Sequence, residues 1–85
     1  MEITVTEQLS RTVVVAPKER IDAFSAPQLR EKFDALLVDG ASQFIVDLSQ
    51  TPFLDSSGMA VLVSLLKRAR QAGGDVKLVK PASEA

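Results

Sequence analysis

Short apolar runs alternate with two segments of helical periodicity along this chain, and this alternation restricts the fold more than any other feature. Residues 2–8 alternate apolar and polar side chains, and residues 11–16 contain three consecutive valines, so both segments are predicted strands. The two-residue connection between them predicts an antiparallel hairpin. The apolar runs at residues 44–48 and 76–79 predict a third and a fourth strand.

Residues 26–38 and 57–71 are predicted helices, because their apolar side chains recur on one face. Ser25 and Gln28 stand at the spacing of a capping box before the first helix, so each side chain is expected to bond the other residue's backbone N–H. Glycine follows each segment, as is typical of a left-handed stop at a helix C-terminus.

The resulting order is strand, strand, helix, strand, helix, strand. It predicts an α/β fold with a four-stranded, mostly parallel mixed sheet. Right-handed crossovers would place both helices on one face of that sheet. The chain is long enough for one domain spanning residues 1–85, with residues 81–85 expected to be a loose tail.

The residue types that most enzymes use are missing from the sequence. It contains no histidine and no cysteine, which excludes the commonest general base and any thiolate ligand. It has neither the G-x-S-x-G pattern of a nucleophilic serine nor a glycine-rich phosphate loop. We therefore expect a protein that is not an enzyme and has no cofactor and no metal, so that a phosphate on this chain would have to come from another protein.

Charge and hydropathy predict where the protein works. The formal net charge of −1 offers no attraction for nucleic acid. The N-terminus lacks the basic and apolar regions of a signal peptide, and no apolar run approaches the roughly 18 residues of a membrane span. These features predict a cytoplasmic protein without membrane insertion.

The turn at residues 55–58, Asp-Ser-Ser-Gly, joins the third predicted strand to the second helix. Unpaired N–H groups and the positive dipole end favour an anion, and a phosphate especially, at a helix N-terminus. The same residue types most often serve only as helix caps. Residues 59–63, which follow, are all apolar, and a phosphate dianion beside an apolar protein contact would disrupt that contact. The turn is therefore either a simple cap or a phosphorylation switch.

The segment FLDSSGM at residues 53–59, with the strand FIVDL at residues 44–48 before it, resembles the signature of the STAS family. Arg-Ile-Asp at residues 20–22 resembles the family's loop before the first helix. The glycine pair at residues 73–74 resembles the residues that end the family's second helix. The family includes bacterial anti-sigma factor antagonists and cytoplasmic domains of sulfate transporters. The resemblance implies the same α/β fold and a role in binding another protein.

In the antagonists, the serine directly after the aspartate is phosphorylated by a partner that is both a serine kinase and an anti-sigma factor. The resemblance implies that this serine is Ser56, with Ser57 as the second choice. It further implies that the unphosphorylated protein binds the anti-sigma factor and thereby frees a sigma factor. An aspartate before the first helix, important for partner contact in the family, falls at Asp22, where it is equally open to a reading as a turn cap. The predicted partner-binding residues are Asp22, Asp55, Ser56, Ser57, Gly58 and Met59.

The chain departs from the family in two places. Lys18 and Glu19 stand where many members have glycine, so the local turn and the fit to a partner are expected to differ. Members usually carry a further helix and strand after the fourth strand, whereas this chain stops at Ala85 and is either shortened or a minimal member. The fourth strand is then expected to be an open edge, which allows a homodimer.

An alternative keeps the fold without the switch. Some STAS proteins act as constitutive subunits of lipid transport complexes of the ABC type, or of stress-signalling assemblies. In that case the serine at the turn would only cap the helix. An enzyme or nucleotide-binding protein is a third possibility, and it would require a measurable affinity for a nucleotide.

Overall fold

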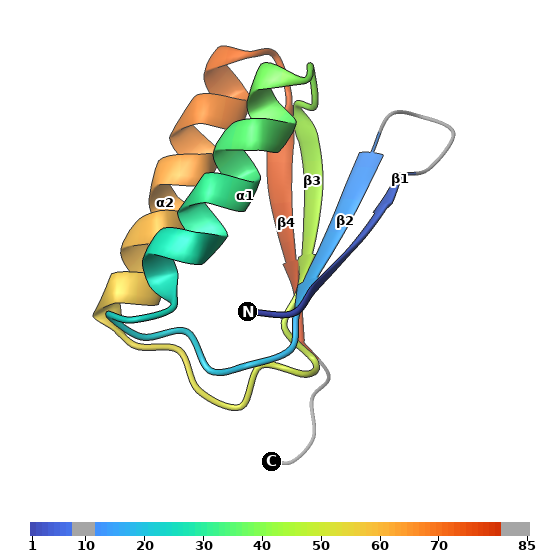
Figure 1. The fold of residues 1–85 in the computed structure, drawn as a ribbon. Helices are drawn as coiled ribbons and strands as arrows, with labels where there is room; N and C mark the ends of the chain where they lie inside the picture. Colours follow the sequence, from blue (N-terminus) through green and yellow to red (C-terminus); the bar gives the residue numbers. More distant parts are fainter. Residues whose placement is uncertain (8–11, 81–85) are drawn as a thin grey trace.

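The computed structural model describes residues 1–7 and 12–80 (Figure 1). The predicted hairpin connection and the predicted tail at residues 81–85 lie outside this part. The predicted end of the first strand at residue 8 and start of the second at residue 11 also lie outside it, and every other observed boundary is within one residue of its prediction. The elements are β1 (Ile3–Glu7), β2 (Thr12–Pro17), α1 (Ala26–Val38), β3 (Gln43–Asp47), α2 (Ser56–Gln71) and β4 (Asp75–Val79).

The strands form one sheet in the order β1-β2-β3-β4. β1 pairs antiparallel with β2, whereas β2–β3 and β3–β4 are parallel pairs. The register places Val5 beside Val15, Val15 beside Val46, and Val46 beside Leu78, so one row of apolar side chains crosses the sheet. The predicted hairpin and mixed sheet of the α/β class are confirmed.

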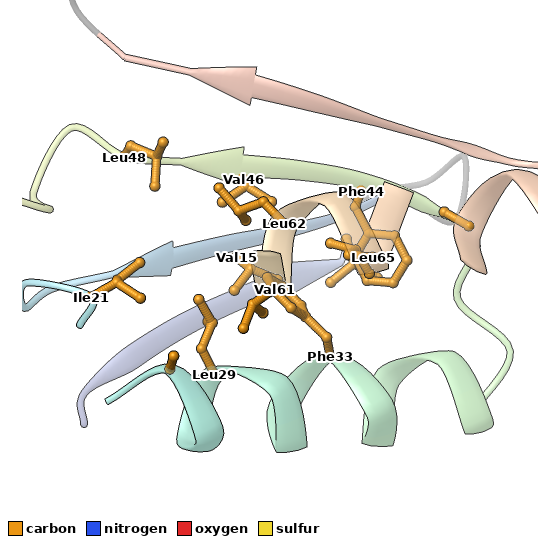
Figure 2. Packing of buried hydrophobic residues seen from close by; sticks show 13 residues of the cluster. Val15, Ile21, Leu29, Phe33, Phe44, Val46, Leu48, Val61, Leu62 and Leu65 are labelled. Atoms are coloured by element: carbon orange, nitrogen blue, oxygen red, sulfur yellow. The ribbon is translucent and has the colours of Figure 1, made fainter. Parts of the chain in front are cut away.

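Both helices lie side by side on the same face of the sheet, as predicted (Figure 1). In β2, buried and half-buried positions alternate, because successive side chains of a strand point to opposite faces. Figure 2 shows the core that results, with side chains of the sheet meeting those of α1 and α2. At its centre Val15 and Val46 are fully buried. Phe33 of α1 meets Phe44 of β3 edge to face, with ring centroids 6.1 Å apart.

The capping box predicted before α1 is wrong. Ser25 is the residue at the N-cap position, but its backbone has helical angles (φ −94°, ψ −20°) instead of the extended ones that let a cap side chain reach the helix amides. Its Oγ donates to the carbonyl oxygen of Arg20 at 2.8 Å and accepts from the N–H of Asp22 at 3.0 Å. The Gln28 side chain accepts instead from the N-terminal ammonium of Met1 at 2.7 Å.

β4 lies at an edge of the described sheet. Leu78 and Val79 on this strand are 49% and 41% exposed, which is high for large apolar side chains in a sheet. The open edge predicted for the fourth strand is therefore present in the described residues, while association through it stays a prediction. Among the residues that the structure describes, no helix combines the length and the apolar content needed to cross a membrane.

Candidate protein-binding site

The loops that follow β2 and β3 lie against each other. An isolated parallel bridge joins Ile21 to Leu54. The N–H of Ile21 donates to the carbonyl oxygen of Phe53 at 2.8 Å, and the N–H of Asp55 donates to that of Ile21 at 3.2 Å. Figure 1 shows the two loops running side by side to the N-terminus of α2 before the first turns back into α1. The bridge thus brings Asp22 next to the turn that starts α2.

Asp55 caps α2. Its backbone is extended (φ −101°, ψ −169°), and its Oδ1 accepts from the N–H of Ser57 at 2.8 Å and of Gly58 at 3.1 Å. The anion that the helix N-terminus favours is therefore this carboxylate itself. The sequence predicted unpaired N–H groups that could bind a phosphate at this helix N-terminus, and this prediction is wrong for the N–H groups of Ser57 and Gly58.

Ser56 and Ser57 differ in accessibility. Ser56 is the first residue of α2 and its side chain is exposed, without a hydrogen bond to the described residues. Ser57 is half-buried and lines a recess between the starts of the two helices, together with Ala23 and Arg30. The sequence cannot separate the two serines, whereas the structure presents Ser56 more openly to another protein.

Gly58 and Met59, the next two residues of the chain, differ in burial. Gly58 is buried, and a Cβ built on it would lie 2.4 Å from Cδ1 of Leu54 and 2.8 Å from Cγ2 of Ile21. Met59 is 47% exposed. The apolar start of α2 is therefore divided: Val61 packs into the core, and Met59 remains on the surface three residues from Ser56.

Asp22 holds the loop before α1 in place. Its Oδ1 accepts from the N–H of Phe24 at 3.0 Å and of Ser25 at 3.2 Å, and its Oδ2 pairs with Nε of Arg20 at 3.0 Å. The Ser25 N–H, the Phe24 N–H and the Arg20 charge lower the pKa of Asp22 below its usual value, against the smaller opposite effect of burial. Asp22 therefore caps a turn as an ionised group, and a direct contact with a partner stays a prediction.

Two exposed phenylalanines belong to the same pair of loops and were missed from the sequence. Phe24 is 88% exposed and Phe53 is 53% exposed. Each stands in a short loop outside the periodic segments, so no strand or helix pattern assigns it to the core. An aromatic side chain in such a loop, next to a predicted site, is the signal that could have identified them.

Replacing Asp55 by alanine is expected to lower the free energy of unfolding by about 1 kcal/mol, because two amides at the start of α2 lose their acceptor. Urea denaturation followed by circular dichroism measures this change. Asp55→Asn keeps an acceptor oxygen and should retain most of the stability. Equal losses in both variants would show that the carboxylate charge, and not the cap, stabilises the helix.

The family model for the STAS domain matches residues 3–85. The chain belongs to the STAS domain family. Curated relatives of this STAS domain are the anti-sigma-B factor antagonist of Bacillus subtilis, 41% identical over 58 residues, and that of Listeria monocytogenes, 31% identical over 58 residues. The matched segment is 68% of this chain and about half of each relative, 52% and 51% respectively.

Solved structures confirm the fold of the STAS domain. SpoIIAA, an anti-sigma factor antagonist, matches in its unphosphorylated form with a TM-score of 0.79 at 22% identity, over 95% of this chain and 74% of that one. The phosphorylated form of Bacillus SpoIIAA matches with a TM-score of 0.78 at 22% identity, over 96% and 75%. An anti-sigma factor antagonist from Mycobacterium paratuberculosis matches with a TM-score of 0.83 at 25% identity, over 95% and 68%.

Proposed function

We propose that this STAS domain is an anti-sigma factor antagonist regulated by phosphorylation of Ser56. In the unphosphorylated state it binds an anti-sigma factor that is also a serine kinase, and a sigma factor is thereby released. The names of its curated relatives support the class of partner. The protein acts by binding and not by catalysis, which agrees with a sequence that contains no histidine or cysteine.

The observation that carries the proposal is that different residues serve as the cap and as the exposed hydroxyl at the start of α2. Asp55 caps the helix, so the reading in which the serine serves only as the cap does not fit Ser56. Its hydroxyl is exposed beside Met59, an apolar side chain that is 47% exposed. A kinase can reach such a hydroxyl, and a docked partner would cover it.

Phosphorylation would reverse the contact for two physical reasons. A phosphate on Ser56 adds a charge of about −1.5 to −2 next to the carboxylate of Asp55. It also places a strongly hydrated group on the helix surface three residues from Met59, where a partner would have to remove water from it. Binding is therefore expected to be weaker, while the fold is retained because the phosphate points to solvent.

The test uses the anti-sigma factor kinase of the protein's own host, with ATP, followed by peptide mapping. One phosphate is expected, on the peptide that contains residues 55–58, in the wild type and in Ser57→Ala but not in Ser56→Ala. By calorimetry, Ser56→Asp should bind at least about tenfold more weakly than the wild type, and Ser56→Ala should bind normally. Phosphorylation of Ser56→Ala at full level, or unchanged binding of Ser56→Asp, would contradict the proposal. Equal binding by the wild type and both Ser56 variants would instead support a constitutive subunit.

A further inference from the structure

Phe24 is the most exposed of the large apolar side chains in the described residues, at 88%. Its neighbours on the chain are fixed in the fold: Ile21 is fully buried three residues before it, and Ala26 is buried two residues after it. The side chain thus stands in water although the backbone that carries it belongs to a packed part of the molecule. Aromatic side chains, phenylalanine among them, are enriched in the cores of protein interfaces, so an exposed ring on a fixed backbone can serve as a contact.

Hydrogen bonds hold the backbone of Phe24 in this outward position. Its own N–H donates to Oδ1 of Asp22 at 3.0 Å, and the N–H of Ala26 donates to the carbonyl oxygen of Asp22 at 2.8 Å. Ser25 links the turn to its start by donating to the carbonyl oxygen of Arg20 at 2.8 Å. A side chain presented by a fixed backbone loses less conformational entropy on binding than one on a loose loop.

The loop that carries Phe24 lies next to the proposed switch, because Ile21 in this loop pairs with Leu54 just before α2. Ala23, which precedes Phe24, lines the same recess as Ser57 at the start of α2. The other walls of this recess come from both helices. Ala26, Pro27 and Val61 are apolar, whereas Arg30 and Glu31 are charged. A partner that covers Ser56 and the start of α2 would therefore reach the loop that carries Phe24.

We infer that Phe24 is the aromatic anchor with which this domain binds its regulatory partner, entering an apolar pocket on that protein. The inference rests on the proposed function, because it takes the partner to be the anti-sigma factor. Buried aromatic anchors carry a large share of the affinity in protein interfaces. Asp22 then acts as a positioning residue, since its carboxylate holds the N–H of Phe24 and does not itself need to touch the partner.

The test measures the affinity of the full chain for the anti-sigma factor of its own host by calorimetry, together with urea denaturation. Phe24→Ala is expected to raise Kd at least about 30-fold, and Phe24→Leu, which keeps an apolar side chain, considerably less. Val38→Ala is the matched control, because Val38 is 85% exposed at the far end of α1 and should leave Kd unchanged. The midpoint of denaturation should stay the same in the Phe24 variants.

The affinities of two Asp22 variants for the anti-sigma factor test the role of Asp22. Asp22→Asn keeps an oxygen that can accept from the N–H of Phe24 and Ser25 but loses the charge, whereas Asp22→Ala loses both. A positioning role predicts that the asparagine variant keeps most of the affinity and the alanine variant does not. Equal loss in both variants would assign Asp22 to a direct charged contact and would overturn the positioning role.

The outcomes separate this inference from the proposed function. If the wild type does not bind the anti-sigma factor, the proposed function fails and the inference fails with it. If the wild type binds and Phe24→Ala binds equally well, only the inference fails. A lower denaturation midpoint in Phe24→Ala and Phe24→Leu would show a structural role for the ring. If the wild type forms a dimer in the absence of the anti-sigma factor, and Phe24→Ala converts it to a monomer, then Phe24 makes a contact between two copies of this chain. Either result would also overturn the inference.

Discussion

Replacing Gly74 by alanine is expected to lower the free energy of unfolding by about 3 kcal/mol, the upper part of the usual range for overpacking. The new Cβ would lie 1.8 Å from the carbonyl oxygen of Ser42 and 2.3 Å from its carbonyl carbon. These are backbone atoms, so no side-chain rotation can relieve the overlap. The same carbonyl accepts from the N–H of Asp75 at 3.0 Å, and separating the two segments would break the start of the β3–β4 pairing.

The matched control is Gly73→Ala in the same glycine pair. Gly73 has a φ of +88°, which disfavours alanine, but nothing lies within 4 Å of the Cβ position. Gly73→Ala is therefore expected to lower the free energy of unfolding only through its left-handed backbone, by about 1–2 kcal/mol. Urea denaturation of both variants measures the difference. A Gly73 variant that is less stable than the Gly74 variant would mean that left-handed geometry, and not the approach to Ser42, explains the glycine pair.

Replacing Gly58 by valine is expected to cost about 3 kcal/mol and to weaken partner binding. Leu54 can turn its side chain away from a new Cβ, but Ile21 cannot: it is fully buried, and both its N–H and its carbonyl oxygen are bonded to the other loop. The substitution would therefore push α2 away from the bridge that joins Ile21 to Leu54. That movement would separate the loop of Phe24 from the turn of Ser56.

Ala60→Val is the control for the lower helix propensity of a β-branched residue. Ala60 lies on the exposed side of the same helix, so its replacement should cost only about 0.5 kcal/mol. Gly58→Ala should fall between the two, because a gain of roughly 1 kcal/mol in helix propensity offsets part of the overlap. Denaturation midpoints and Kd for the anti-sigma factor are the measurements. Full stability in Gly58→Val would refute the close approach of α2 to the two loops.

The elements were predictable because their signals are local. The boundaries of α1 at Ala26–Val38 follow from periodicity, Pro27 in the first turn and a glycine after the last. The caps were less predictable. Asp55 and Ser56 are both good cap residues, and α2 begins at Ser56 only because Asp55 is held extended next to the bridge between the loops. At Ser25, contacts with the loop replaced the capping box that local spacing predicts.

The candidate site was likewise predictable only in part. The sequence placed Ser56 at the start of a helix and gave Asp22 two possible roles. It could not show that Asp22 bonds the N–H of Phe24, or that Phe24 is 88% exposed. Both facts depend on the turn that Ser25 and Asp22 close together, and several polar residues nearby could have formed other turns.

The sequence by itself determined the order of strands and helices, the apolar face of α1, and the lack of the residue types used in most catalysis. Only the tertiary structure decided that the loop at Ile21 pairs with the loop at Leu54, and so which side chains share one surface. The physical reason is that periodicity reports burial within one segment. Hydrogen bonds between distant segments depend instead on how the whole sheet and both helices pack.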